Sequence, residues 1–458
     1  MEVKQQAHTD YRTNTMNNRP PVSKRCFTSP AIEQEIERVT ARITDPQVAA
    51  LFVNCFPNTI DTTVTLGTDD QGRPDTFVVT GDIDAMWLRD STNQVWPYLP
   101  FVNEDPELKR LIQGVINRQA RCVLIDPYAN AFNREATGSH WKSDFTVMLD
   151  DLHERKYELD SLCAVMRLAN GYYEISKDAS CFDERWHDAM RRIVATIRTE
   201  QAGADEIQKD DYRFQRQTVT PTETLACHGY GQPARRCGLS KSPFRPSDDA
   251  AMLPFLIPAN AMAVVCLRQL ATIWRDVCGL PSDADSADSL ANEIDAAIRK
   301  HAVIDHPEFG QILAYEVDGF GSYYCMDDGN VPSLLSLAYL GYLATDDPLY
   351  VNTRKFVLSS FNPYYADGKA AKGVGSPHTG RGTIWPMALI MQALTSNSAT
   401  EVAECLKTLR DTHAGTFFMH ESFAKDDASS FTREWFAWAN TLFGELILNI
   451  EARFPELL

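Results

Sequence analysis

Several spacings that identify common catalytic centres are missing from this sequence. None of the eleven cysteines forms a Cys-x-x-Cys pair, and they are scattered singly between Cys26 and Cys405. A metal site or disulfide framework would show regular spacing. HExxH, GxSxG, GxGxxG and P-loop patterns are also missing, so a zinc protease, an α/β-hydrolase and a nucleotide-binding domain are not indicated. We therefore expect no metal ion and no cofactor. The spacing leaves undecided whether one disulfide bond forms, for example between Cys227 and Cys237.

Basic residues are too few for an anionic partner. Lysine and arginine together number 44 against 62 aspartate and glutamate, which gives a formal net charge of −18. Nucleic acids and anionic membranes both require a basic face on the protein. We expect neither as a partner, while the sequence says nothing about the oligomeric state.

Long apolar runs are equally scarce. The longest, Ala250–Leu267, contains Pro254, Pro258 and Asn260, which favours a buried loop leading into a helix over a membrane span. The N-terminal stretch MEVKQQAHTDYRTNTMNNRPPVSKR lacks the apolar region of a signal peptide. Together with the scattered cysteines, typical of a reducing compartment, this predicts a cytoplasmic protein.

What the sequence does contain is helical periodicity. Residues 108–116 place Leu108, Leu111, Ile112 and Val115 on one helical face, the one-sided stripe of an amphipathic helix. Further stripes of this kind occur at 159–166, 186–197, 402–409 and 435–450. The pattern predicts a large, mainly helical domain.

Strand patterns are few, and no βαβ alternation is visible. Residues 62–66 and 76–80 flank a turn and predict a hairpin, and 212–216 with 217–220 predicts a second short pair. Residues 1–28 have few apolar residues and no periodicity. We expect them to be a mobile N-terminal tail, followed by a single catalytic domain over residues 29–458.

Four segments between the helices combine Gly, Pro, Asp, Arg, His and Trp. They are Thr80–Thr92, Pro243–Ala250, Gly373–Pro386 and Met419–Trp438. Loops carried by a rigid scaffold are where function concentrates. Aromatic faces stack on pyranose rings, and Asp and Arg hydrogen-bond neighbouring hydroxyls, so these segments predict a sugar site.

Two carboxyl groups that face each other across a cleft suffice for acid–base hydrolysis of a glycoside. Asp248 and Asp249 follow Arg245, and Glu421 lies between His420 and Ser422. The spacing alone does not separate these candidates from ordinary roles, because an Asp pair also serves as a helix N-cap and a lone Glu as a solvated surface group.

At the same four segments the sequence resembles glycoside hydrolase family 125, the exo-α-1,6-mannosidases. The resemblance spans roughly residues 30–455. The matching segments are TGDIDAMWLRDS, FRPSDDA followed by LIPAN, DDGNVPSLLSLAYLGY, GSPHTGRGTIWPMALIMQA, and HESF followed by TREWFAWANTLFGE. The resemblance implies an all-α (α/α)6 barrel, with a few short β-hairpins in the loops that form the cleft. It also implies inverting, metal-independent release of mannose from the non-reducing ends of α-1,6-mannosides, so an α-mannoside glycan is the expected substrate.

The resemblance also implies roles for individual residues. The general acid falls on Asp248, with its neighbour Asp249 as the alternative, and the general base falls on Glu421. The positions expected near the terminal mannose are Asp82, Trp87, Arg89, Asp90, Arg245, Asp249, His378, Arg381 and Trp385. One departure is visible: a tryptophan that often precedes FRPSDD in the family is replaced here by the stretch 238–243, which leaves the preference at the second subsite open.

The sequence is also compatible with other functions on the same scaffold. Another (α/α)-barrel glycoside hydrolase would share the scaffold, as would a phosphorylase, although a phosphorylase would have a phosphate pocket in place of Glu421. A non-catalytic sugar-binding protein on the same scaffold would be expected to lack one of the two carboxylates, and both are present here.

Overall fold

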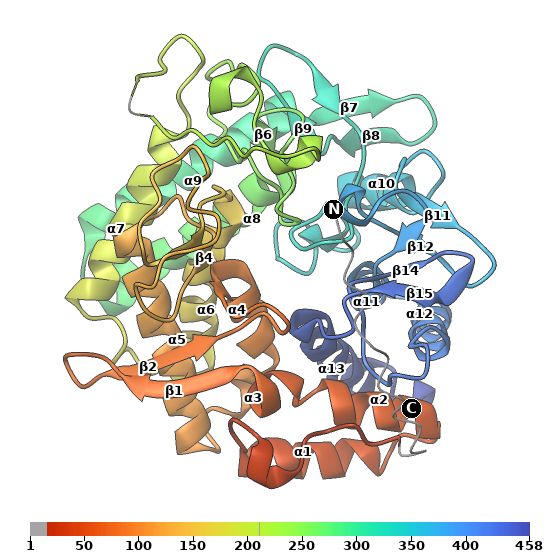
Figure 1. Ribbon diagram of the computed structural model, residues 1–458. Coiled ribbons are helices and arrows are strands. Elements are labelled where there is room, and N and C mark those ends of the chain that lie inside the picture. The colour runs from red at the N-terminus through yellow and green to blue at the C-terminus, as the bar shows by residue number, and fades with distance from the viewer. Residues whose placement is uncertain (1–15, 210) are drawn as a thin grey trace.

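The computed structural model describes residues 16–209 and 211–458. Helices dominate it (Figure 1), and sheets are small. The α-helices are α1 (Pro30–Thr40), α2 (Pro46–Cys55), α3 (Asn58–Thr62), α4 (Leu88–Val95), α5 (Pro106–Ile125), α6 (Leu159–Ser176), α7 (Glu184–Thr199), α8 (Ile257–Thr272), α9 (Pro281–His301), α10 (Pro348–Val357), α11 (Pro386–Leu394), α12 (Ala399–Asp411) and α13 (Ala437–Arg453). This confirms the helical class that the periodicity predicts.

A closed ring of segments forms the centre of the molecule. In order around it, α4 packs on α6, α6 on α8, α8 on the short 3-10 helix Leu335–Leu337, this segment on α11, α11 on α13, and α13 on α4. The orange α4 and the dark blue α13 are therefore neighbours in Figure 1 although they lie near opposite ends of the chain. Other helices pack outside the ring: α5 on α6 and α7, α9 on α8, and α12 on α11.

Ring helices are more buried than outer ones, and the sequence explains the difference. All eight residues of α4 are buried, whereas α7 buries one face and places charged residues on the other, as its stripe predicts. Several outer helices begin with an aspartate N-cap. Asp45, Asp105 and Asp183 each accept a hydrogen bond from at least one N–H group of the following turn. Such caps stabilise a helix end by about 1 kcal/mol.

The strands are short and lie in the connections. They are β1 (Val64–Thr68), β2 (Pro74–Val78), β3 (Met86–Trp87), β4 (Ala131–Phe132), β5 (Leu152–Glu154), β6 (Phe255–Leu256), β7 (Val303–His306), β8 (Gly310–Leu313), β9 (Glu316–Val317), β10 (Tyr323–Tyr324), β11 (Tyr365–Asp367), β12 (Lys372–Val374), β13 (Thr383–Ile384), β14 (Ser422–Ala424) and β15 (Asp427–Thr432). The β1–β2 pair confirms the expected hairpin. β3, β6 and β13 each run directly into, or end one residue before, a ring helix, so the small sheets fix where those helices begin.

Two expectations differ from the structure. The pair 212–216 with 217–220 does not form among the described residues, because Gln215 exchanges backbone hydrogen bonds with Phe145 instead. Of the expected tail, residues 1–15 lie outside the described part. The following stretch packs on the body, where Arg19 forms ion pairs with Glu33 and Asp61.

The stretch Ile257–Val277, which comprises α8 and a π-helical turn, is the one described helical stretch long and apolar enough to cross a membrane. Within its most apolar window 78% of the residues are buried inside the protein. It belongs to the ring, where α6 and α9 cover it, so its apolar composition has a structural reason in the core.

Candidate active site

Four loop regions and the starts of ring helices converge on one cavity with about 340 Å³ of open space. The cavity is lined by Trp87, Arg89, Asp90, Pro246, Ser247, Asp248, Asn330, His378, Trp385, Glu421, Arg433, Phe436 and Trp438. All four segments that the sequence analysis selected contribute to it.

Aromatic residues stand at the N-terminal ends of three ring helices around this cavity. Trp87 precedes α4, Trp385 precedes α11 and Phe436 precedes α13, and none of the three side chains caps its own helix. Each is extended in backbone conformation and lines the cavity. The helix starts thus supply aromatic walls for a sugar ring, and their amide ends add a partial positive potential.

The Asp248 loop is a tight, anchored turn. The amide of Asp248 donates to the carbonyl of Arg245, and the amide of Arg245 donates to the carbonyl of Asp249. Glu316 anchors the loop. Its carboxylate accepts a hydrogen bond from the Arg245 guanidinium at 2.6 Å and hydrogen bonds from the backbone amides of Met252 and Leu253. Asp248 itself has a φ of 63°, a left-handed conformation that is uncommon outside glycine and that often marks functional positions.

The Asp248 carboxyl is held in place by neutral donors. Its Oδ1 accepts from the Trp87 indole at 3.3 Å and from the Asn130 amide at 3.1 Å. The Arg89 guanidinium lies 3.8 Å away. Burial alone would raise the pKa of Asp248, but hydrogen bonding with Glu158 and the charges of Lys156, Arg89 and His378 lower it.

Glu421 lies in the same cavity, immediately before β14, and is 6% exposed. An Arg433 nitrogen lies 3.6 Å from its Oε1, and the Arg433 guanidinium is itself held by Asp82 through Nε at 3.0 Å. The Arg433–Asp82 pair thus fixes the position of a cation beside the Glu421 carboxyl.

His378 places a positive charge near Asp248, Asp249 and Glu421. Its Nδ1 lies 3.3 Å from Oδ1 of Asp249. Burial lowers its pKa, but the hydrogen bond and charge of Asp249, together with Glu421 and Asp248, raise the pKa of His378 to about 9. The ring is therefore an imidazolium at neutral pH.

Three polar atoms of the cavity wall have no hydrogen-bond partner among the described residues. They are Nε of Arg89, Oδ2 of Asp90 and the side-chain amide nitrogen of Asn330, all in buried residues, although the Arg89 guanidinium lies 3.3 Å from Oδ2 of Asp90 as an ion pair. Unpaired buried polar groups are costly, and a polyhydroxyl ligand would satisfy them. Burial raises the pKa of Asp90 to about 6, with Asp248 adding to the rise and Arg89 opposing it.

The structure brings most, but not all, of the expected site residues to the cavity. Asp248, Glu421, Trp87, Arg89, Asp90, His378 and Trp385 line it. Asp82, Arg245, Asp249 and Arg381 do not. For these four the substrate contact stays a prediction, and for three of them the structure shows what the side chain faces instead of the cavity.

Asp82 is turned toward Arg433 and positions that side chain. Arg245 is buried and directed at Glu316, so it holds the loop. Asp249 is 1% exposed and faces His378, which leaves Asp248 as the carboxyl of the pair that reaches the cavity. Arg381 is exposed at the surface beside the cavity, and nothing in the structure explains a role for it.

Several residues of the site were not among those expected. Asn330 and Arg433 lie within segments that the resemblance includes, so the sequence carried a signal for them. Asn130 and Glu158 lie outside those segments. Only the packing of α4 and β4 beside the Asp248 loop reveals these two residues.

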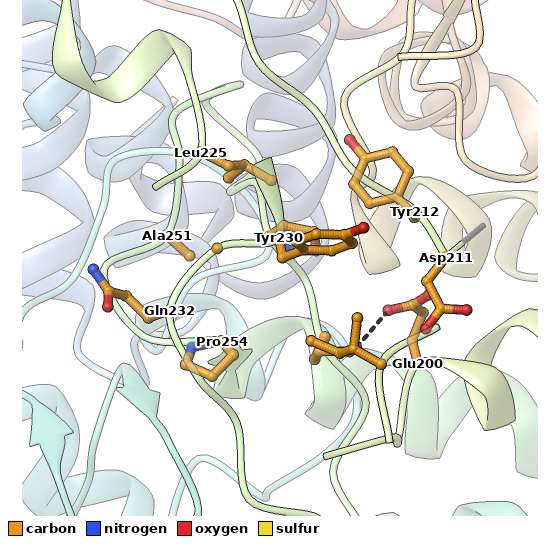
Figure 2. A pocket seen from close by; sticks show the side chains of 12 residues that line it. Glu200, Asp211, Tyr212, Leu225, Tyr230, Gln232, Ala251 and Pro254 are labelled. Carbon is orange, nitrogen blue, oxygen red and sulfur yellow. Dashed lines mark ion pairs between the residues drawn. The ribbon is translucent and has the colours of Figure 1, made fainter. Parts of the chain in front are cut away.

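A second cavity lies behind the Asp248 loop and is drawn in Figure 2. Pro243, Ala251 and Pro254 of that loop form one side, and Glu200 forms an ion pair there with Lys241 at 3.3 Å, the dashed line in Figure 2. Glu200 is engaged by Lys241 there, and this cavity contains neither Asp248 nor Glu421, so we assign the chemistry to the cavity that holds those two carboxyls.

Within residues 16–209 and 211–458, three or more His, Cys, Asp or Glu side chains never gather in a way that could hold a metal ion. All eleven cysteines fall in this part of the chain and are free, so the open Cys227–Cys237 bridge is not formed. Cys227 is exposed and Cys237 is partly buried.

Comparisons with known proteins agree on one family. A family model described as metal-independent alpha-mannosidase (GH125) matches residues 45–448. The "Meiotically up-regulated gene 157 protein" of Schizosaccharomyces pombe is 46% identical over 455 residues, covering 96% of this chain and 89% of that protein.

Solved structures support the same assignment. A Streptococcus pneumoniae structure from a family of metal-independent alpha mannosidases, a non-productive complex with alpha-1,6-mannobiose, is 40% identical with a TM-score of 0.88, covering 92% of this chain and 98% of that one. A bacterial glucoamylase complexed with acarbose is 13% identical with a TM-score of 0.52, covering 81% of this chain and 50% of that one. The second likeness concerns the fold alone.

Proposed function

Because the chain belongs to glycoside hydrolase family 125, the metal-independent α-mannosidases, we propose that it removes single α-1,6-linked mannose residues from non-reducing ends with inversion. The observation that carries this proposal is that Asp248 and Glu421, from segments far apart in the chain, line one small cavity. The α-1,6 linkage is taken from the Streptococcus pneumoniae relative, whose structure holds alpha-1,6-mannobiose.

The shape of the cavity supports exo action. The cavity is small, and aromatic residues close it at the starts of three ring helices, as a site for one terminal sugar requires. Hydroxyls of this sugar would bond to Nε of Arg89, Oδ2 of Asp90 and the side-chain amide of Asn330, the wall atoms without a hydrogen-bond partner among the described residues. A site that pairs such groups discriminates strongly against sugars that leave them unpaired.

In this proposal Asp248 is the general acid. It gives its proton to the glycosidic oxygen as the bond from that oxygen to the anomeric carbon breaks. Trp87 and Asn130 fix its Oδ1, and the anchored turn fixes its backbone. Asp249 is less suited to the role because it is enclosed and directed at His378.

Glu421 is the general base. It takes one proton from a water molecule, whose oxygen attacks the anomeric carbon from the face opposite the leaving group. Arg433 lies 3.6 Å from its Oε1 and holds the carboxyl toward the cavity, which Glu421 and His378 both line. Inverting enzymes keep their two carboxyls roughly 6.5–9.5 Å apart to hold this water, and we expect that separation here.

The ring of α4, α6, α8, Leu335–Leu337, α11 and α13, surrounded by outer helices, supports the description of the fold as an (α/α)6 barrel with the site at the N-terminal ends of its inner segments. The free state of the eleven cysteines supports a reducing compartment, and we propose the cytoplasm.

The direct test is release of free mannose from α-1,6-mannobiose, with the α-1,2 and α-1,3 isomers as controls. The proposal requires efficient hydrolysis of the α-1,6 isomer alone. Comparable turnover of α-1,2-mannobiose would contradict the linkage, and the lack of mannose release from all three isomers would contradict the proposed function.

A further inference from the structure

Glu158 stands beside the proposed acid but does not touch the cavity. It stands at the N-cap position of α6, and its side chain makes no cap hydrogen bond. Its Oε2 accepts hydrogen bonds from Arg89 and from Ser161. Its Oε1 is buried and has no hydrogen-bond donor among the described residues. A fully buried carboxyl with an unsatisfied oxygen, next to another carboxyl, requires a reason.

The reason lies in the charges around Arg89. One guanidinium faces four carboxyls: Glu158 in close contact, Asp160 at 3.1 Å, Asp90 at 3.3 Å and Asp248 at 3.8 Å. The nearest other cation, Lys156, is engaged by Glu154 at 3.5 Å and Glu223 at 3.0 Å. An excess of buried negative charge is costly, so this cluster must retain protons at neutral pH.

Two carboxyls in hydrogen-bond contact hold a single proton more firmly than either would alone, since like charges at that distance cannot both ionise. Glu158 and Asp248 meet at the same guanidinium, since Arg89 contacts Oε2 of Glu158 and lies 3.8 Å from Oδ1 of Asp248. Oε1 of Glu158 has no donor among the described residues, and the two side chains are within hydrogen-bonding reach of each other. Asp248 is the partner that reaches solvent, with 25% of its side chain exposed, whereas Glu158 is fully enclosed.

We propose that Glu158 and Asp248 share one proton and that Glu158 is the positioning residue that keeps this proton available to Asp248 for the glycosidic oxygen. In the open cavity water stabilises an ionised Asp248, and the proton rests on Glu158. A bound sugar expels that water, so the proton moves to Asp248 while Glu158 stays ionised against Arg89 and Ser161.

The proton balance of one turnover follows directly. The shared proton passes from Asp248 to the leaving oxygen, which receives the electron pair of the broken bond. Glu421 takes a proton from the attacking water, and the remaining hydroxyl forms the new bond to carbon. Glu421 then loses its proton to solvent, and the Glu158–Asp248 pair regains one.

The pKa directions agree with a shared proton. Burial, with Asp248 and Asp160, raises the pKa of Glu158 well above its ordinary value against the opposing charge of Arg89. The pKa of its partner Asp248 is lowered. The charged groups facing the pair are Arg89 and Asp90 on α4, Lys156 and Asp160 next to Glu158, and His378 across the cavity.

The test is Glu158→Gln, and it rests on the proposed function. The amide still accepts from Arg89 but cannot share an acidic proton. We expect kcat/KM for α-1,6-mannobiose to fall about 10- to 100-fold, up to the lower end of what general acid catalysis contributes, because Asp248 itself is retained. The fall should be much smaller for dinitrophenyl mannoside, whose leaving group needs no proton. The alkaline limb of kcat/KM should move down by about one pH unit or more, because Asp248 loses its carboxylate neighbour.

Asp160→Asn is the matched control. Asp160 is equally enclosed, contacts the same Arg89 at 3.1 Å and also has an unpartnered oxygen, but it has no hydrogen bond with Asp248. Its variant should affect both substrates alike and shift the alkaline limb less. Equal losses on both substrates in Glu158→Gln, with an unmoved alkaline limb, would overturn the inference and leave the mannosidase assignment standing. An inactive wild-type protein would overturn the assignment itself.

Glu158→Asp covers the case in which Glu158→Gln does not fold. It keeps a carboxyl but draws it back from Asp248, so the alkaline limb should move in the same direction by a smaller amount. A limb identical to that of the wild-type protein would contradict the sharing of a proton.

Discussion

The Trp87 indole donates a hydrogen bond to Oδ1 of Asp248 at 3.3 Å, across 161 positions of the chain. One residue ends β3 before a ring helix, and the other stands at the tip of an anchored turn. The contact orients one carboxyl oxygen and leaves the other for the cavity. The candidate acid is thus placed by tertiary packing between two of the segments that the resemblance singled out.

The separate roles of Asp248 and Glu421 predict different responses to the leaving group. Asp248→Asn should lower kcat/KM for α-1,6-mannobiose by about 10²–10⁴-fold but affect dinitrophenyl mannoside far less, since that leaving group departs unprotonated. Glu421→Gln should impair both substrates by a similar factor, because water activation is needed for each. If Asp249→Asn rather than Asp248→Asn shows the leaving-group pattern, the acid is the neighbouring residue.

Arg433 links an exposed carboxylate to the candidate base. It is held by Asp82 and lies 3.6 Å from Glu421, so Arg433→Gln should leave the base less well positioned and lower kcat/KM for α-1,6-mannobiose and dinitrophenyl mannoside alike. Asp82→Asn should cause a smaller loss on both substrates, because it acts through Arg433. In a double-mutant cycle the two effects should not add. Full additivity would show that Asp82 acts independently.

His378 predicts a pH-dependent contribution to stability. The pKa of His378 in the folded protein is about 9, above its ordinary value of about 6.5. Its protonated form therefore stabilises the fold fully below about pH 6.5, and this contribution is lost as the pH rises through about 9. His378→Gln should lower the free energy of unfolding at about pH 6 and differ less from the wild type at about pH 10, as measured by urea unfolding. A difference independent of pH would contradict this account.

Chelation should leave the activity intact. The family is metal-independent, and acid–base chemistry by two carboxyls needs no Lewis acid. Hydrolysis of α-1,6-mannobiose after dialysis against EDTA is expected to match that of the untreated enzyme. A loss that Ca²⁺ or Zn²⁺ restores, but Na⁺ does not, would overturn the expectation.

The helical class and much of the cavity could be predicted from the sequence, for a physical reason. Apolar stripes report which faces of a helix are buried, and the β1–β2 hairpin follows from local turn chemistry. Trp87, Asp248 and Glu421 stand in polar, glycine- and proline-containing segments, which cannot pack as a core and so are free to form a site. The closure of the ring by α13 against α4 depends on contacts between chain ends that no local pattern encodes.

Residue types alone could not distinguish side chains that line the cavity from side chains that hold other residues in place. Arg245 and Asp82 have the chemistry of sugar-binding residues, but their guanidinium and carboxylate are directed at Glu316 and Arg433. Glu158 was missed altogether, because it lies outside the segments that the resemblance includes. Only the position of Arg89 between α4 and α6 explains why it faces Asp248.

The measurement that tests the central claim most directly is proton NMR of α-1,6-mannobiose hydrolysis in its first minutes. If Glu421 activates water opposite a leaving group protonated by Asp248, the first free mannose must be the β-anomer, with α-mannose growing in later by mutarotation. Appearance of α-mannose first would contradict inversion, as would a glycosyl adduct trapped on Glu421.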